Sequence, residues 1–523
     1  GMSLAEIKNP MTEMTSANFE PSLDYVVTKI PHWPFDLRKS AQCQLNTQMK
    51  SVGEGMALGR NLEESLLKAI QSLADTSHIE LVSLKQLTDD DLTQKIVHAQ
   101  EDRLFALAES LRRGYNTIEE LAEITKIDLL FLDKIAHIVE IESLLSERKD
   151  DFDVLKVAKQ NGFSDQKIAQ LWHTEKEKIL HFRKQQGLSA VFKMVDSCAG
   201  EFIAKRPYFY RSYETENESS SKQKPAILLL GAGPIGIGQG LEFDYANVQA
   251  ISAVQQAGYE AIVINDNPSS LSTDFMIADK LYFEPLTSEA VYDIVEQEKP
   301  VGVIGQFGGT STYRLSEELA ELGINLLAMD LNKLQEIKDP LKFDRMLKTL
   351  EINPRQRQVV STEKEALASV ESMGFPIAIR SYDLFNEDNV RRVDEKETLA
   401  VGLNYLKHKG DSPLLVVENY TSVRECEADI IYDGSTIFIA GITEYIERSD
   451  VHSGDSITVY PAQNFSKEVL QKVEVYSKQI IKHLDLIGVM NIQFVISENQ
   501  VYVNRVLPYA SRSLPFLSKI KKV

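Results

Sequence analysis

Three glycines follow a short apolar stretch in the middle of the chain, with a spacing that is typical of loops that bind phosphate groups. The stretch AILLL at residues 226–230 predicts a buried parallel strand, and Gly231, Gly233 and Gly236 follow it as G-x-G-x-x-G. Asp266 comes after the next predicted strand, where a dinucleotide enzyme holds a ribose hydroxyl. The pattern therefore raises the hypothesis of a nicotinamide-dependent oxidoreductase.

The residues after the third glycine argue against that hypothesis. The stretch IGQG at residues 237–240 would occupy the first turn of the helix that a dinucleotide loop needs. Each glycine costs about 1 kcal/mol in a helix interior. The strand that ends at Asp266 continues into the polar stretch PSSLSTD, which does not suit ribose binding. The oxidoreductase stays open as the less favoured alternative.

The composition is that of a globular protein with several domains. The 523 residues include 57 Lys and Arg against 77 Asp and Glu, and this net charge of −20 disfavours a nucleic-acid partner. The apolar stretches fall short of the roughly 20 residues that cross a membrane, and the N-terminus lacks the form of a secretion signal. Three widely spaced cysteines, Cys43, Cys198 and Cys426, suit a reducing compartment. We therefore expect a cytoplasmic protein without a membrane or nucleic-acid partner.

The pattern of apolar residues changes along the chain and predicts a multidomain α/β and α+β fold. Residues 1–72 contain a strand-like stretch and an amphipathic helix with leucines on one face, and are too short to form a good core alone. Residues 73–212 are predicted to be all-helical and 213–225 to be a linker. Residues 226–340 are predicted to form a small parallel α/β domain, and 341–523 an α+β domain.

Single elements are also predicted. Thr117, three residues before Glu120, has the spacing of a capping box at a helix start. A long helix is expected near residues 467–484. The expected strands lie at 226–230, 260–265, 301–305, 414–418, 435–440, 492–496 and 500–506.

Several stretches together resemble one enzyme family. They are FEPSLDYVVTKIP and TQMKSVGEGMALGR near the start, GAGPIGIGQGLEFDYANVQA, INDNPSSLSTDFMIADKLYFEP and GVIGQFGGTSTYRLSEEL in the middle, and SDVHSGDS and MNIQFVISENQVYV near the end. In this order they resemble the large subunit of carbamoyl phosphate synthetase over essentially the whole chain.

The resemblance implies a role for each part of the chain. Residues 1–72 would be the end of the first ATP-grasp half, and 73–212 the oligomerisation domain. Residues 226–340 would be the Rossmann-like pre-ATP-grasp domain, and 341–523 a C-terminally truncated ATP-grasp domain. The resemblance thus implies that the ATP-grasp domain is truncated and that the chain forms homo-oligomers.

The resemblance also implies a reaction. The parent enzyme is an ATP-dependent ligase that uses two ATP, bicarbonate and ammonia, which a glutamine amidotransferase small subunit releases from glutamine. Its second half phosphorylates carbamate to carbamoyl phosphate for arginine or pyrimidine biosynthesis. The implied cofactors are ATP, Mg²⁺ or Mn²⁺, and K⁺ in a nearby loop.

Site residues follow from the same resemblance. It implies that Arg380 contacts phosphate, that Glu425 lies near the ribose and that Arg512 is catalytic. Gln493 is implied as a metal ligand, and Glu447 as a ligand in the cation loop. The other residues implied around ATP are Val417, Glu418, Tyr420, Val451, His452 and Ser453.

Two of the family's motifs are altered in this chain. The glycine-rich loop after the arginine reads RSYDLFNEDNV, which has no glycine to let backbone amides close over phosphate. In the metal motif E-x-N-P-R, Arg505 replaces the glutamate, Leu507 the asparagine and Tyr509 the arginine. In the preceding domain, Gly236 stands where the family often has arginine, and Ser269 where it has glutamate.

These changes predict a weakened metal site. Magnesium prefers oxygen ligands, usually carboxylates, and Arg505 supplies none. Like unit charges about 4 Å apart cost roughly 4 kcal/mol at an effective dielectric near 20, and about twice that against a dication. We therefore expect weak Mg²⁺ or Mn²⁺ binding and no catalysis by this chain alone. The alternative is a non-catalytic structural or regulatory paralogue that associates through its helical domain.

Overall fold

The structure is a computed structural model that describes residues 1–33, 45–73, 83–202, 207–220, 224–234, 241–274, 276–354, 357–381, 390–396, 398–400, 402–403, 415–419, 423–447 and 456–522. The chain divides into two compact units. The first comprises residues 1–237, 247–303 and 321–325, and the second comprises 238–246, 304–320 and 326–523.

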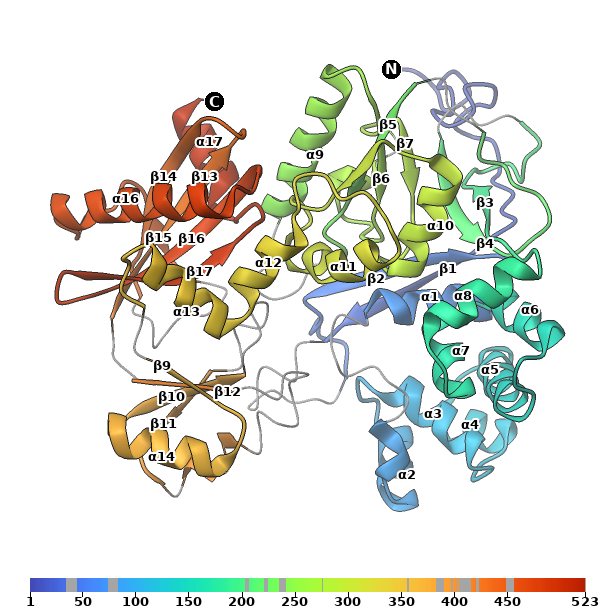
Figure 1. The fold of residues 1–523 in the computed structure, drawn as a ribbon. Coiled ribbons are helices and arrows are strands. Elements are labelled where there is room, and N and C mark those ends of the chain that lie inside the picture. The colour runs from blue at the N-terminus through green and yellow to red at the C-terminus, as the bar shows by residue number, and fades with distance from the viewer. Residues whose placement is uncertain are drawn as a thin grey trace. The chain divides into compact units, whose positions relative to one another are not determined.

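A six-stranded sheet forms the centre of the first unit. Its strands are β3 (Val191–Met194), β4 (Tyr208–Ser212), β5 (Ala226–Leu230), β6 (Glu260–Ile264), β7 (Lys280–Tyr282) and β8 (Gly302–Ile304), in the order β3-β4-β7-β6-β5-β8 (Figure 1). Strands β4, β7, β6 and β5 are parallel to one another, and β3 is antiparallel to β4. The connecting helices are α9 (Leu241–Gln256), α10 (Ser288–Glu298) and α11 (Gly309–Glu321), with a short 3₁₀ helix η2 (Leu271–Thr273). The parallel α/β sheet predicted from the sequence is present, and β5 has the predicted bounds.

The N-terminal residues pack into this same unit. Strands β1 (Val26–His32) and β2 (Gly53–Gly59) form an antiparallel hairpin that leads into α1 (Leu62–Ser72). The leucines Leu66 and Leu67 contact the helical module, as an amphipathic helix would. The opposite face of α1 is also buried, which the sequence did not indicate. It is polar, and Lys68 on it lies 2.8 Å from the fully buried carboxylate of Glu284.

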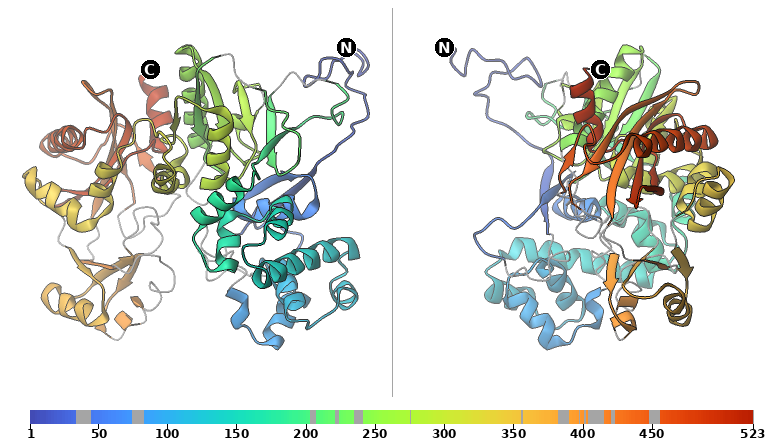
Figure 2. Two further views of the ribbon diagram at one scale, coloured as in Figure 1. Left: turned by 45° about the vertical axis from the view of Figure 1, so that its right-hand side comes forward. Right: turned by 90° about the vertical axis from the view of Figure 1, so that its left-hand side faces the viewer.

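Helices dominate the next stretch and form one compact cluster beside the hairpin (Figure 2). They are α2 (Asp89–Val97), α3 (Arg103–Arg112), α4 (Ile118–Thr125), α5 (Leu129–Glu147), α6 (Phe152–Gln160), α7 (Asp165–Trp172) and α8 (Lys176–Gln185), after a 3₁₀ turn η1 (Ser83–Gln86). The predicted capping box is present, because Thr117 and Glu120 bond to each other's backbone at the start of α4. We call α2–α8 the helical module.

The helical part ends earlier than the sequence suggested. Residues 73–212 were expected to be all-helical, but β3 and β4 lie within them. Their apolar and aromatic residues, such as Phe192 and Tyr210, are buried at the edge of the parallel sheet, which favours strands over helix. The expected linker at 213–225 is also partly packed, because Tyr213 and Ser219 are buried.

The second unit contains two antiparallel sheets. The smaller consists of β9 (Arg357–Val360), β10 (Ile377–Ser381), β11 (Val390–Val393) and β12 (Leu415–Asn419), in the order β11-β10-β12-β9, with α14 (Glu363–Met373). The larger consists of β13 (Arg424–Tyr432), β14 (Ile437–Tyr445), β15 (Thr458–Val459), β16 (Gly488–Ser497) and β17 (Gln500–Leu507), in the order β15-β14-β13-β16-β17. Its helices are α12 (Leu331–Lys338), α13 (Pro340–Thr349), α16 (Lys467–Leu484) and α17 (Ser513–Lys521).

One face of the larger sheet carries an apolar core. Cys426, Ala428 and Ile430 of β13 pack there against α16, whose bounds are those predicted from the sequence. Burial raises the pKa of the Cys426 thiol well above its ordinary value, so this cysteine is a packing residue. The opposite face of β13 is therefore the one that presents polar side chains. The multidomain α/β and α+β fold is thus as predicted.

Gln306 fixes the start of β16. Its side-chain amide donates to the carbonyls of Ala328 and Ile487, each at 3.1 Å, and accepts from the amide of Val489 at 3.3 Å. Gly488 permits this close approach, because its φ is +115° and a Cβ there would lie 1.9 Å from Gln306 Oε1. The strand that carries Gln493 is thereby anchored at its first residues.

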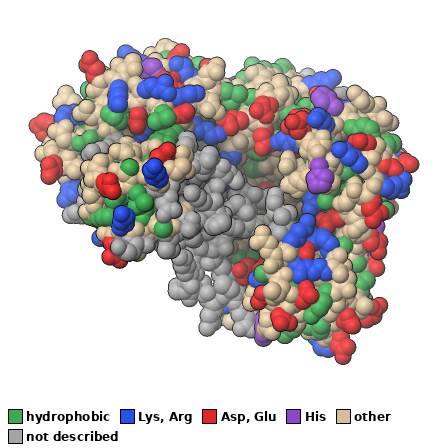
Figure 3. All heavy atoms as spheres, turned by 60° about the horizontal axis from the view of Figure 1, so that its bottom comes forward, with side chains coloured by type: hydrophobic (Ala, Val, Ile, Leu, Met, Phe, Trp, Pro, Cys, Tyr) green, Lys and Arg blue, Asp and Glu red, His purple; other side chains and the backbone are tan. Residues whose placement is uncertain are grey.

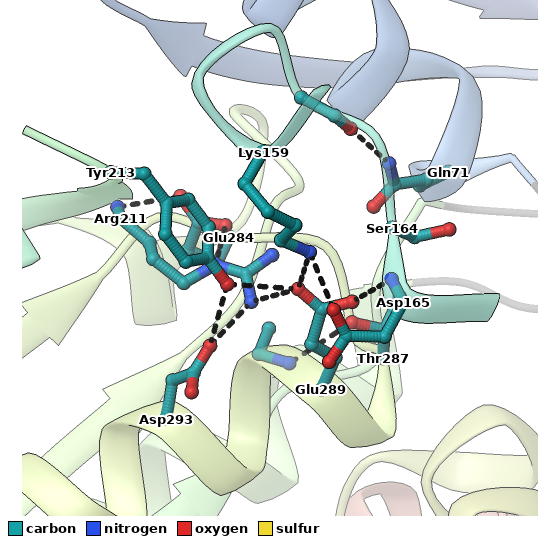
Figure 4. A network of polar contacts seen from close by, with 12 residues as sticks. Gln71, Lys159, Ser164, Asp165, Arg211, Tyr213, Glu284, Thr287, Glu289 and Asp293 are labelled. Atoms are coloured by element: carbon teal, nitrogen blue, oxygen red, sulfur yellow. Dashed lines mark hydrogen bonds and ion pairs between the residues drawn. The ribbon is translucent and has the colours of Figure 1, made fainter. Parts of the chain in front are cut away.

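Charged side chains from five elements meet inside the first unit (Figure 4). Three are cations and three are anions: Lys159, Arg183, Arg211, Asp165, Glu289 and Asp293. All six side chains are at most 10% exposed. We call this group the buried ion cluster.

Glu289 on α10 joins three of the elements. Its Oε1 lies 2.7 Å from Lys159 Nζ of α6 and 3.0 Å from Arg211 Nη1 of β4. Its Oε2 accepts from the backbone amide of Asp165 at 2.6 Å, at the start of α7. Burial by itself would raise the pKa of Glu289, but the charges of Lys159, Arg211 and Arg183 outweigh it and hold that pKa well below its ordinary range.

Replacing Glu289 should destabilise the first unit strongly. Glu289→Gln removes the anion that Lys159 and Arg211 share and leaves two buried charges undercompensated, so we expect a loss of about 3–5 kcal/mol. Glu296→Gln on the same helix is the control, because Glu296 is 56% exposed and pairs with Lys184 at the surface. Its expected cost is at most about 1 kcal/mol. Urea unfolding followed by circular dichroism would contradict this prediction if both variants shifted the transition equally.

Gly488→Ala should destabilise the second unit. Alanine there combines backbone strain with displacement of Gln306, and overpacking of this kind costs about 1–3 kcal/mol beyond the strain. Gly374→Ala is the matched control, because Gly374 has a φ of +78° but nothing within 4 Å of its Cβ position. Thermal denaturation should show a clearly larger loss for the Gly488 variant. Equal losses would mean that the contact with Gln306 is unimportant.

Candidate functional site

Two of the expected ATP-contacting positions lie side by side in the smaller sheet. Arg380 on β10 pairs with Val416 on β12, directly beside Val417, whose partner is Ile379. Val417 is fully buried and Arg380 is 8% exposed. Glu418 pairs with Ala378 through its backbone. The structure therefore places the arginine next to the expected hinge strand.

Several expected positions lie outside the described residues. They are Tyr420, Val451, His452 and Ser453, the glycine-free segment at 384–389, and Gly236 of the glycine loop. Their roles therefore stay predictions.

Two positions that the family resemblance implies for a metal site are cross-strand neighbours. Gln493 on β16 pairs directly with Arg505 on β17, and Glu427 on β13 pairs with Gln493 from the other side. Thr443 on β14 completes the row, next to Glu427. Because alternate residues of a strand share a face, these four side chains lie on the face opposite the apolar core.

The residues at this position do not fit a magnesium ion. Arg505 offers only hydrogen-bond donors and a positive charge next to the amide of Gln493. Leu507 belongs to the apolar core cluster and has no oxygen to offer. Magnesium requires a near-octahedral set of oxygen ligands. Of the three positions Gln493, Arg505 and Leu507, only Gln493 therefore has a side-chain oxygen that can bind a metal ion.

The remaining expected residues have structural partners. Glu447 follows β14, and its Oε2 accepts from the amide of Ile457 at 2.8 Å. Glu425 lies on β13 and pairs with Val495 of β16. Arg512 is the N-cap residue of α17 and is exposed. None of these contacts tests a role in binding ATP or a cation.

Sequence reasoning missed a pair of acids on the same sheet face. Glu427 is 5% exposed and Asp429 is 1% exposed. Ser513 Oγ lies between them, 2.5 Å from Glu427 Oε1 and 2.7 Å from Asp429 Oδ2. We call Glu427, Asp429 and their polar neighbours the acidic pair site. The alternation E-x-E-x-D at residues 425–429 was the signal in the sequence that could have located it.

Among the described residues, the side chains that contact the two acids are neutral. Asn491 Nδ2 donates to Asp429 Oδ1 at 3.0 Å, and the Ser511 hydroxyl contacts the same oxygen. Tyr445 donates to Glu427 Oε2 at 2.9 Å, and Thr443 Oγ1 lies 3.3 Å from Glu427 Oε1. Burial raises the pKa of both carboxyl groups, and the charge of Asp429 raises that of Glu427 further. The pair is therefore a site at which a positive charge or a proton is stabilised.

The glycine loop has a structural explanation in its described part. The amide of Gly233 donates to Asn265 Oδ1 at 3.1 Å. A Cβ on Gly231 would lie 2.3 Å from the Asn265 side chain. Asp266 is fully buried at the end of β6, where a ribose hydroxyl would have no access to it. Close packing between strands thus accounts for the first two glycines, and the dinucleotide hypothesis loses its main support.

The charge distribution and the helices agree with the composition. Acidic and basic side chains are intermixed on the face shown in Figure 3. No helix among the described residues is long and apolar enough to cross a membrane.

Solved structures resemble parts of this chain at low identity and low TM-score. The biotin carboxylase of Campylobacter jejuni is 12% identical, with a TM-score of 0.47, covering 57% of this chain and 68% of that chain. N5-carboxyaminoimidazole ribonucleotide synthetase from Thermotoga maritima is 15% identical, with a TM-score of 0.41, covering 56% and 71%. These scores are too low to add to a family assignment.

Three domain descriptions of one family match successive parts of the chain. Residues 54–187 match the oligomerisation domain of the carbamoyl-phosphate synthetase large chain. Residues 223–336 match the carbamoyl phosphate synthase preATP-grasp domain, and residues 339–521 match the ATP-binding domain of the L chain. The helical module, strands β5 to β8 of the six-stranded sheet and the two antiparallel sheets fall within these three ranges in the same order, whereas β3 and β4 lie between the first two ranges. The chain therefore belongs to the family of carbamoyl-phosphate synthetase large chains.

Proposed function

We propose that this chain is a non-catalytic member of its family, in which the ATP-grasp domain keeps its fold but no longer phosphorylates carbamate. The observation that carries the proposal is the direct pairing of Gln493 with Arg505 on adjacent strands. A positive side chain stands where a carboxylate would have to hold a metal ion. Phosphoryl transfer depends almost entirely on charge neutralisation and positioning, so this replacement affects the central requirement of the reaction.

The nucleotide part of the site is less affected than the metal part. Arg380 on β10 lies beside the buried Val417 of β12, the expected hinge strand, so some affinity for ATP is compatible with the structure. In the parent reaction a metal ion bridges the phosphates and neutralises the transferring group. The side chain of Arg505 is a hydrogen-bond donor held on β17, so it cannot bridge the phosphates as a metal ion does. The proposal is therefore ATP binding with little dependence on magnesium.

ATP affinity gives the first test. We expect isothermal titration calorimetry of the full chain to show weak ATP binding, which Mg²⁺ strengthens only slightly. The physical reason is that, of the three protein ligands that the resemblance implies, only the neutral Gln493 remains to hold a magnesium ion. Low-micromolar ATP affinity that a chelator abolishes would contradict the proposal.

Catalysis gives the second test. The reverse reaction forms ATP from ADP and carbamoyl phosphate, and we expect no measurable rate. Loss of the metal site should cost several kcal/mol in the barrier, where about 1.4 kcal/mol corresponds to a tenfold change in rate. An ordinary enzymatic rate from the unmodified chain would overturn the proposal.

A repair variant separates metal binding from turnover. The double variant Arg505→Glu with Leu507→Asn should bind Mg²⁺–ATP more tightly and stay nearly inactive, because the segment at 384–389 still lacks glycines. Lys478→Glu is the control, since it reverses a charge on a 51% exposed residue of α16. If the double variant gains no metal-dependent binding, then Arg505 and Leu507 do not occupy the metal positions.

A structural or regulatory role is the second candidate function. It is supported by the buried ion cluster, which ties the helical module firmly to the parallel sheet whatever the state of the ATP site. In this role the helical module would mediate homo-oligomers, and a glutamine amidotransferase subunit would be the partner to test. Light scattering of the chain alone, and with such a subunit, measures both associations. The oxidoreductase alternative is tested by nicotinamide titration, for which we expect no binding.

A further inference from the structure

The acidic pair site holds two carboxylates that have no charged partner among the described residues. Within that part of the chain, Glu427 and Asp429 contact only hydroxyl and amide groups, and neither takes part in an ion pair. This differs from the buried ion cluster, in which each anion meets at least one cation. Two uncompensated buried charges cost several kcal/mol each, so the site requires a positive species.

The hydroxyl protons do not suffice for the contacts that are present. Ser513 Oγ approaches Glu427, Asp429 and Ser511, the last at 2.9 Å, but a serine has only one proton to donate. Ser511 likewise contacts both Asp429 and Ser513 with one proton. Some of these oxygen pairs therefore meet without a hydroxyl proton between them, which is unfavourable unless a cation or an additional proton lies among them.

Asn491 adds an independent observation. It is 1% exposed, and its amide is directed at the pair, because its Nδ2 lies 3.0 Å from Asp429 Oδ1. Its carbonyl oxygen, Oδ1, is buried and has no hydrogen-bond partner. A buried amide oxygen without a partner costs about 1–3 kcal/mol, and it is a ligand that hard cations accept. Rotation of the amide by half a turn would bring this oxygen to the acids.

We propose that Glu427, Asp429 and Asn491, with the hydroxyls of Ser511 and Ser513, form a binding site for one hard divalent cation close to calcium in size. Two carboxylates balance the charge of a dication. An amide oxygen and two hydroxyls complete a set of oxygen ligands of the type that such ions prefer.

The spacing favours calcium over magnesium. Ser513 Oγ occupies a point 2.5 and 2.7 Å from one oxygen of each acid. Calcium–oxygen distances are about 2.3–2.6 Å, whereas magnesium needs about 2.0–2.1 Å. A calcium-sized ion could therefore sit close to that point after Ser513 rotates, with little movement of the carboxylates. Tyr445 and Thr443 would continue to orient Glu427 from its outer side.

This site adjoins the position that the family resemblance implies for a metal, because Glu427 pairs with Gln493 and Asn491 pairs with Leu507, but its ligands are other residues. That position corresponds to Gln493, Arg505 and Leu507 on β16 and β17, whereas the acids lie on β13. Ser511 and Ser513 flank Arg512 at the start of α17. A bound ion would therefore fix the start of α17 against β13 and β16. The inference does not rest on the proposed loss of catalysis.

The test uses the full chain after treatment with a chelator, without nucleotide. We expect calorimetry to show one Ca²⁺ bound per chain, with Mg²⁺ weaker, and thermal unfolding to shift upward as Ca²⁺ is added. Asp429→Asn and Asn491→Ala should each weaken Ca²⁺ binding by about tenfold or more, since one tenfold step corresponds to the loss of a modest ligand interaction. Glu474→Gln, which changes an acid that is 51% exposed on α16, should bind like the unmodified chain.

A measurement on the unmodified chain covers the case in which a variant fails to fold. Terbium, a luminescent substitute for calcium, should be sensitised by tyrosine, since Tyr445 contacts Glu427, and millimolar Ca²⁺ should displace it. The inference is overturned if Ca²⁺ and Mg²⁺ neither bind nor shift unfolding, or if Asp429→Asn binds Ca²⁺ unchanged. An Asp429→Asn chain that is more stable than the original without any effect of cations would show instead that the pair holds only a proton.

Discussion

The first unit depends on the buried ion cluster. Three cations and three anions are removed from water there, and each would cost several kcal/mol if it stood alone. Because Glu289 and Asp293 lie on one helix of the parallel sheet and their partners lie on α6, α8 and β4, the charges are satisfied only when helical module and sheet are in place together. The helical module and the parallel sheet must therefore pack against each other for the charges to be paired. Apolar contacts alone would fix the geometry of this packing less strictly.

The second unit separates fold from chemistry by using opposite faces of one sheet. The residues Cys426, Ala428 and Ile430 alternate along β13 with Glu427 and Asp429. The apolar set packs against α16 and holds the sheet together, so changes on the polar face leave the fold intact. An arginine at position 505, where the family resemblance implies a carboxylate, is therefore compatible with an intact strand register and core. Loss of a metal position and retention of an ATP-grasp fold are therefore compatible.

Electrostatics distinguishes the two polar interiors. In the first unit the opposite charges are matched by side chains of the chain itself, and Glu289 is held ionised. In the acidic pair site the groups that contact the acids are neutral among the described residues, and burial raises the pKa of both acids. The former arrangement is complete without any ligand, whereas the latter requires a proton or a cation. The proposed cation site thus rests on the unmatched charge of two buried acids, and this argument does not depend on the family resemblance.

The sequence by itself determined the order of the domains, the parallel strand 226–230 and the helix Lys467–Leu484, because these depend on local periodicity and on residue type. It did not reveal that α1 buries its charged face, or that residues 191–194 and 208–212 are strands. Lys68 finds Glu284 across 216 positions of sequence, and β4 finds β7 across about 70, so neither partner is visible locally. The pairing of Gln493 with Arg505 and the meeting of Glu427, Asp429 and Ser513 were likewise decided by strand register, which only tertiary packing fixes.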